Sequence, residues 1–212
     1  MLTQQEIMQN KADFIALLSN MDFPEADITG LINFLESSDF FTAPASSQYN
    51  CAFEGGLCLH SLSVYFILND LVSKYAPNTY STNTLKIVGL LHDLYKTNFY
   101  ESYVQNKKVY CPTGSKQDNL GTFDWVSVPT YKVKESNNRY IMGDNSFTTY
   151  MLVSRYIPLT EMEIAVLVNQ NCGMDNGYAN KEIFRVLEKF PLAALVHSAD
   201  LLSHYTIEKH YE

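Results

Sequence analysis

The sequence predicts a mostly α-helical protein with a small antiparallel β insertion, and three observations lead to this fold class. Apolar residues recur at helical spacing from the start of the chain to about residue 95, and again from residue 147 onward. Between residues 99 and 141, Tyr, Val and Thr dominate and alternate locally, which is typical of strands. The 212 residues contain no repeat, so a single domain over 1–212 with an insertion at about 99–141 accounts for the chain.

The N-terminal half predicts four helices. Thr3 can cap a first helix that has one apolar face, and Pro24 opens a second helix that runs to about residue 35. Residues 40–56 form a loop, because they combine Pro, several serines and a Gly-Gly pair. We expect a third helix over 57–75 and a fourth over 84–95.

Helical spacing resumes after the insertion. A capping box is expected at Thr160 and Glu163, since the two residues lie three apart before an apolar run. Pro191 marks the start of the last helical segment. The predicted helices lie at 147–156, at 160–171, and in a final pair that begins near residue 180.

Composition and charge limit the classes of function. The net charge is -8 and no basic run exceeds two residues, which argues against long nucleic acid as a partner. The polar N-terminus does not resemble a signal peptide, and no apolar run approaches the roughly 20 residues of a membrane span. The 4 cysteines show no metal-binding spacing. We therefore expect a soluble, cytoplasmic protein with reduced thiols, and the oligomeric state is left open.

Four residues stand out as candidate metal ligands: His60, His92, Asp93 and Asp200. The His-Asp pair lies within an apolar helical run, where burying both groups without partners would cost several kcal/mol, on the order of 2–7 per polar group. A divalent ion that takes imidazole nitrogen and carboxylate oxygen removes that cost. Taken singly, a histidine on an apolar helix is more often a hydrogen-bonded core residue than a ligand, and His-Asp dipeptides also occur by chance.

The flanking residues resemble a known family. Residues 54–62 read EGGLCLHSL, residues 91–96 read LHDLYK, and residues 197–200 read HSAD. This set is similar to the HD-domain phosphohydrolase superfamily, in the Gly-Gly-Leu-x-x-His branch of bacterial and phage hydrolases. The likeness covers most of the chain beyond the first helices, and it implies an HD-type helical bundle.

The resemblance also implies roles for individual residues. His60, His92, Asp93 and Asp200 take the metal-ligand positions, and they would hold one divalent ion (Mn, Fe, Ni, Co, Zn or Mg). Asp93 would also orient or deprotonate the attacking water. Lys96 lies where relatives hold a substrate phosphate, although a lysine that extends to solvent fits the same position.

Three further residues are candidate substrate contacts, and each also has a structural interpretation. Tyr95 can stack on a base or pack in the core. His197 lies on the same helical face as Asp200, and it can contact substrate or pack between helices. Asn171 lies where this branch commonly has a histidine.

The chain departs from the branch at three places where relatives carry extra histidines. Here residues 50–51 read Asn-Cys, residues 141–144 read Ile-Met-Gly-Asp, and residues 170–173 read Gln-Asn-Cys-Gly. Asn and Met are poor replacements for imidazole as ligands of a borderline metal. These departures predict at most one tightly held ion, or a site whose substrate contacts have been rebuilt.

The resemblance and the acidic charge together favour a divalent-metal-dependent phosphohydrolase that acts on a small phosphorylated metabolite, with a nucleotide as the expected substrate. Two alternatives stay open. One is a phosphodiesterase or 3′-to-5′ exonuclease, because the branch includes such enzymes. The other is a degenerate, non-catalytic HD domain that binds a nucleotide or a protein partner, and the missing histidines favour it.

Overall fold

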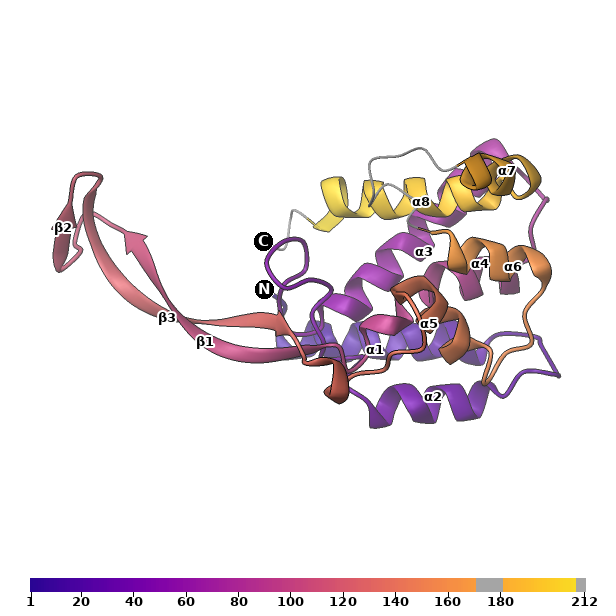
Figure 1. The fold of residues 1–212 in the computed structure, drawn as a ribbon, viewed down its shortest axis with the longest axis horizontal. Coiled ribbons are helices and arrows are strands. Elements are labelled where there is room, and N and C mark those ends of the chain that lie inside the picture. The colour runs from indigo at the N-terminus through magenta and orange to yellow at the C-terminus, as the bar shows by residue number, and fades with distance from the viewer. Residues whose placement is uncertain (171–180, 209–212) are drawn as a thin grey trace.

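The computed structural model describes residues 1–170 and 181–208, and within these ranges the chain is mostly helical with a three-stranded antiparallel sheet (Figure 1). This confirms the predicted mixture of helices with a β insertion. The helices pack into one body, and the sheet extends away from it as a long arm (Figure 1). In chain order the elements are α1 (Gln4–Ser19), α2 (Ile28–Ser37), α3 (Gly56–Tyr75), α4 (Thr82–Leu90), the short 3-10 helix η1 (Leu94–Lys96), β1 (Tyr100–Tyr110), β2 (Lys116–Asp118), β3 (Gly121–Val133), the short 3-10 helix η2 (Ser136–Asn138), α5 (Asn145–Val153), α6 (Glu161–Val168), α7 (Lys181–Lys189), α8 (Leu192–Leu202) and the π-helical turn η4 (Ser203–Ile207).

Two predicted helix starts are confirmed. The Thr3 hydroxyl accepts a hydrogen bond from the Glu6 backbone N–H, and the Glu6 carboxylate accepts one from the Thr3 N–H. Thr160 and Glu163 form the same reciprocal capping box at α6. Each box satisfies two backbone donors that a helix end would otherwise leave unpaired.

Several predicted helix boundaries were wrong: α5 ends at Val153 rather than at residue 156, α6 ends at Val168 rather than at residue 171, and two further differences have a clear cause. The second helix does not open at Pro24; it begins at Ile28, where the Asp27 side chain accepts from the Gly30 N–H. The Asp27 carboxylate accepts a hydrogen bond from a backbone N–H that the helix end leaves unpaired, whereas the Pro24 side chain has no acceptor. The fourth helix ends at Leu90 rather than at residue 95, so that His92 and Asp93 lie in the turn before η1.

Helix α3 runs through the centre of the body and packs against α1, α4 and α8. Among the described residues it is the one helix long and apolar enough, by length and composition, to cross a membrane, and 67% of the relevant window is buried inside the protein. The prediction that no apolar run approaches this length was therefore wrong. Because α3 is mostly buried and packs against three other helices, its apolar composition is that of a core helix.

The start of α3 depends on the Gly-Gly pair. Gly55 has φ of +79°, a left-handed conformation that favours glycine. A Cβ on Gly56 would lie 2.1 Å from the Cys51 carbonyl oxygen, so the chain can make this close approach only without a side chain. The tight turn places His60 in the second turn of α3, where it is completely buried.

The β-arm, defined as residues 100–133, has strand order β1-β3-β2. Its register runs from Tyr100 opposite Val133 to Tyr110 opposite Phe123. Most of its side chains are exposed, including Val104 at 71% and Trp125 at 52%. The strands pair with one another, and in chain order the arm leaves the body between η1 and α5 (Figure 1).

Candidate metal centre

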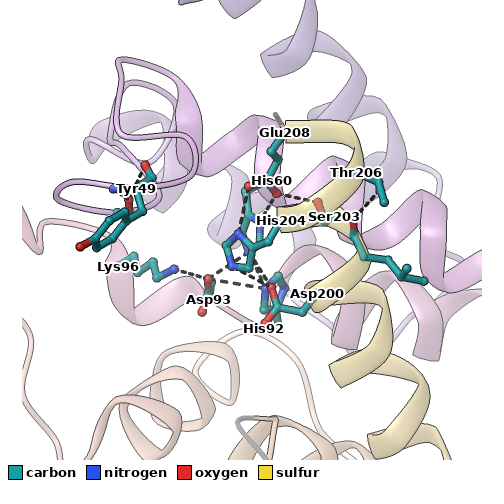
Figure 2. Close-up of polar contacts among 12 residues, drawn as sticks. Tyr49, His60, His92, Asp93, Lys96, Asp200, Ser203, His204, Thr206 and Glu208 are labelled. Atoms are coloured by element: carbon teal, nitrogen blue, oxygen red, sulfur yellow. Dashed lines mark hydrogen bonds and ion pairs between the residues drawn. The ribbon is translucent and has the colours of Figure 1, made fainter. Parts of the chain in front are cut away.

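The structure brings His60, His92, Asp93 and Asp200 together from three parts of the helical body. His60 comes from α3, Asp200 comes from α8, and the His-Asp pair comes from the turn after α4. Figure 2 shows the two imidazoles and the two carboxylates directed at one another. In sequence the members are as much as 140 residues apart, so only the packed bundle can assemble them.

The end of α4 explains how adjacent residues reach one point. Side chains of neighbouring residues on an α-helix diverge by about 100°. Because the helix stops at Leu90, the His92 and Asp93 side chains converge instead, with His92 Nε2 3.6 Å from Asp93 Oδ2. His92 Nδ1 lies 2.8 Å from the Gly89 carbonyl oxygen, which anchors the ring to the last turn of α4.

The donor atoms are spaced as ligands of one ion would be. His60 Nε2 lies 3.1 Å from His92 Nε2, 3.2 Å from Asp93 Oδ2 and 3.4 Å from Asp200 Oδ1. Two ligands at about 2.1 Å from a shared ion, and at tetrahedral or octahedral angles, lie about 3.0–3.5 Å apart. The residues therefore fit a divalent ion, and the buried His60, His92 and Asp200 group can hold one.

The hydrogen-bond acceptors beside His60 and His92 indicate which ring nitrogen of each histidine is unprotonated. The Gly89 carbonyl can only accept, so we assign the proton of neutral His92 to Nδ1. His60 Nδ1 lies 2.6 Å from Glu208 Oε1, and the same reasoning assigns its proton to Nδ1. In this tautomer both Nε2 lone pairs face the centre, as metal-ligating histidines with an oriented outer nitrogen do.

The electrostatics of the cluster reflect its carboxylates. Burial alone lowers the pKa of His60, but hydrogen bonds to Asp93 and Glu208, with the charge of Asp200, raise it to about 10. Burial lowers the pKa of His92, and its neighbouring carboxylates do not compensate. Burial raises the pKa of Asp93, yet the Lys96 ammonium and the histidines hold it well below its usual value. One proton on His60 can thus occupy the place of a cation.

Lys96 is bonded to the cluster rather than extended to solvent. Its Nζ lies 2.6 Å from Asp93 Oδ2, and the residue is 9% exposed. Burial lowers the pKa of this ammonium, but the Asp93 carboxylate overcomes that effect and raises it above the usual value, so Lys96 is charged. Figure 2 shows Lys96 approaching Asp93 from the side away from the imidazoles.

The other predicted substrate contacts are placed differently. The Tyr95 ring packs edge-on against Phe99 at 5.3 Å between centroids, and burial raises the pKa of its hydroxyl. His197 Nδ1 lies 3.1 Å from the Gln170 carbonyl oxygen, and its buried Nε2 has no hydrogen-bond partner within the ranges described. Asn171 lies outside the described residues.

Two of the three places where the HD branch that the sequence resembles carries an extra histidine can be located, and both hold apolar contacts. Cys51 is completely buried in a small cluster with Ala45, Phe53 and Leu59. Met142 packs against the main core. These side chains fill space in the fold, and imidazole nitrogens are absent from both positions.

Sequence reasoning missed two residues of the cluster. Glu208 is completely buried, and its carboxylate contacts both His60 and His204. His204 Nε2 lies 3.4 Å from Asp200 Oδ1. The signal was the spacing: Asp200, His204 and Glu208 are four residues apart in turn, which places them on one helical face.

Comparison with known proteins returned no matching family model, curated protein or solved structure.

Proposed function

We propose that this chain is a divalent-metal-dependent phosphohydrolase of the HD-domain type, with a small phosphorylated metabolite, and specifically a nucleotide, as substrate. The observation that carries the proposal is the convergence of His60, His92, Asp93 and Asp200, whose donor atoms lie 3.1–3.4 Å from His60 Nε2. The sequence order of these ligands supports the HD-domain assignment.

The four residues would hold the ion, and each contributes in a distinct way. His60 and His92 supply neutral nitrogen donors whose direction is fixed by Glu208 and by the Gly89 carbonyl. Asp93 and Asp200 supply two negative charges, which favour a divalent cation over a monovalent one. When bound, such an ion lowers the pKa of water and polarises a phosphoryl oxygen.

Lys96 and Asp93 would act together on the substrate. An ammonium has three N–H donors, and the ion pair with Asp93 uses one of them. The remaining donors can reach a phosphate oxygen and offset the charge that develops there. Asp93 keeps its carboxylate ionised beside the ion, so it can accept a proton from the attacking water.

The substrate class follows from charge. A polymer with many phosphates would be repelled by a chain of net charge -8, whereas a small phosphate needs only the local cation of Lys96 and the metal. A nucleotide meets these conditions and is the substrate class of the resemblance.

One observation favours a second candidate function. Cys51 and Met142 are built into apolar packing where relatives have histidine, so the auxiliary ligands have been replaced by side chains that stabilise the fold. A non-catalytic HD domain that binds a nucleotide as a sponge or regulator fits that replacement.

One experiment separates these candidates. Protein loaded with Mn²⁺ or Co²⁺ would be incubated with a panel of nucleoside mono-, di- and triphosphates, cyclic dinucleotides and a single-stranded oligonucleotide, and the products would be quantified. We expect turnover of a mononucleotide or dinucleotide that His92→Ala abolishes. Stoichiometric nucleotide binding without turnover would establish the binding domain, and shortening of the oligonucleotide from one end would establish the exonuclease.

A matched control uses the partly buried His197. It lies on the same helix as Asp200, and its ring Nδ1 is bonded to the Gln170 carbonyl oxygen rather than to any of the four candidate ligands. His197→Ala should retain metal content, so that a loss of metal in His92→Ala alone reports on ligation. Equal metal content in wild type and His92→Ala would contradict the proposed centre.

A further inference from the structure

His204 places a third imidazole beside the cluster, with Nδ1 toward Glu208 and Nε2 toward Asp200. Its Nδ1 lies 3.1 Å from Glu208 Oε2, a carboxylate oxygen that can only accept. We therefore assign the proton of neutral His204 to Nδ1, which leaves Nε2 bare and directed at Asp200.

Asp200 Oδ1 is the atom that these imidazoles share. It lies 3.4 Å from His60 Nε2 and 3.4 Å from His204 Nε2, and it is buried without a hydrogen-bond partner among the residues described. A buried carboxylate oxygen costs free energy unless a cation compensates it, and either protonated His60 or a bound metal ion can do so here. Asp200 also belongs to the His60, His92 and Asp200 group that can hold a metal ion, so an ion beside Asp200 Oδ1 would lie near the two Nε2 atoms, of His60 and His204, that are 3.4 Å from this oxygen.

The local backbone explains why His204 can join the cluster. Residues Ser203–Ile207 form a π-helical turn that continues α8. A π-turn is wider than an α-turn, and it is found frequently at functional sites. It brings the His204 ring parallel to that of His60, at 18° between planes and 4.9 Å between centroids (Figure 2).

Glu208 holds both rings at once. One oxygen takes His60 Nδ1 at 2.6 Å and the Ser203 hydroxyl at 2.6 Å, and the other takes His204 Nδ1 at 3.1 Å. Both oxygens are therefore committed to N–H and O–H donors. His60, His204 and Glu208 also form a group that can hold a metal ion of its own. Because both Glu208 oxygens already accept hydrogen bonds, Glu208 fits the role of orienting the two imidazoles better than that of ligating a separate ion.

We propose that the segment 203–208 completes the metal centre: His204 Nε2 is an additional ligand of the ion held by His60, His92, Asp93 and Asp200, and Glu208 is the positioning residue that orients His60 and His204. The inference deepens the proposed function, and it rests on that function only in requiring that a metal binds. Three imidazoles with two carboxylates select a borderline transition metal such as Mn, Fe, Co, Ni or Zn over Mg, which prefers oxygen ligands.

The test measures metal binding and not activity. Metal-free wild type, His204→Ala, Glu208→Gln and the control His197→Ala would be titrated with Co²⁺ against a chelating dye, with visible absorption of the bound cobalt and X-ray absorption recorded on the same samples. For wild type we expect one equivalent, a signal from three imidazoles, and binding of Mg²⁺ at least 100-fold weaker. For His204→Ala we expect one equivalent with two imidazoles, a changed cobalt spectrum, and an affinity about 10- to 100-fold lower.

The remaining variants separate ligation from orientation. Glu208→Gln keeps the shape of the side chain but replaces one acceptor oxygen by a donor NH₂, so we expect all three imidazoles with an affinity about tenfold lower. His197→Ala should match wild type in both readouts. Far-ultraviolet circular dichroism of each variant would establish that it is folded before titration. If His204→Ala does not fold, the more conservative His204→Asn would be titrated in its place.

The results that would contradict this inference can be told apart from one another. A spectrum and affinity unchanged by His204→Ala would overturn the inference and leave the four-ligand centre intact. Two equivalents in wild type that fall to one in His204→Ala would show that His204 serves a second ion. A wild type that takes up no cobalt would overturn this inference together with the proposed function.

Discussion

The helical body and the β-arm differ in how far along the chain their partners lie. In the body, the cluster around His60 takes members from α3, from the turn after α4, from α8 and from η4, so it exists only when the whole bundle is packed. In the arm, each β1 residue pairs with a β3 residue from the same short segment. A change in the body should therefore affect both metal binding and folding, whereas a change in the arm should affect neither strongly.

The largest effect is expected for Asp93→Ala. The variant removes a ligand and leaves the buried Lys96 ammonium without its partner at 2.6 Å. We expect loss of metal, and a free energy of unfolding of the metal-free protein lower by about 3 kcal/mol, as for a broken buried ion pair. Elemental analysis and urea denaturation measure the two effects.

The double variant Asp93→Ala with Lys96→Met separates the loss of metal from the loss of stability. It removes the unpaired charge, so it should recover most of the stability without recovering the metal. Recovery of the metal, or no recovery of stability, would contradict the account of this ion pair.

A pair of matched truncations compares the two regions directly. Leu57 is completely buried at the start of α3, and Leu57→Ala should lower the free energy of unfolding by about 3 kcal/mol through the cavity it creates. Val104 is 71% exposed on the arm, and Val104→Ala should change it by less than about 0.5 kcal/mol. Denaturant midpoints measured side by side test this, and similar costs would mean that the arm is packed in solution.

The pH dependence of metal affinity should follow from His60. Its pKa of about 10 in the metal-free cluster is raised by Asp93, Glu208 and Asp200, so at pH 7 to 9 the ring carries a proton that the metal must displace. The apparent affinity should rise about tenfold per pH unit in this range, with about one proton released per ion. His92 contributes no release there, because its pKa is lowered and it is already neutral.

Isothermal titration in buffers of different ionisation enthalpy counts the protons. Release of about one proton at pH 8, absent when Glu208→Gln lowers the pKa of His60, would support the assignment. An affinity that is flat between pH 7 and 9 would contradict it.

The smallest effect is expected from shortening the arm. Replacing residues 104–129 by Asn-Gly would join Tyr103 to Thr130, which already face each other in the register, through a two-residue hairpin turn. Metal affinity should stay within about twofold and the melting temperature within a few degrees, since each degree or two corresponds to only tenths of a kcal/mol. Loss of metal in this variant would show that the arm supports the site.

Much of this architecture could be predicted from local patterns. The capping boxes, the Gly-Gly entry to α3 and the strand alternation near residue 131 are short-range signals, and the elements they predicted are present. The early end of α4 was not predictable in this way. Leu91 to Tyr95 reads as helix by composition, and the requirement that His92 and Asp93 converge on His60 comes from tertiary packing.

The same distinction between local sequence signals and tertiary packing applies to the candidate site. The four candidate ligands could be identified because residue type and family-like spacing both indicate them, and the structure brings them together. Glu208 was not, because a glutamate near the end of a helical run ordinarily lies in solvent, and its burial depends on His60, 148 residues away. The role of His204 likewise depends on a π-turn that periodicity does not predict.

The most direct test of the metal centre is an anomalous difference map from crystals grown with Co²⁺ and measured at the cobalt absorption edge. The account predicts one strong peak about 2.1–2.3 Å from His60 Nε2, His92 Nε2, Asp93 Oδ2 and Asp200 Oδ1. A map without a peak among these four atoms, or with its peak between Glu208 and His204 instead, would contradict it.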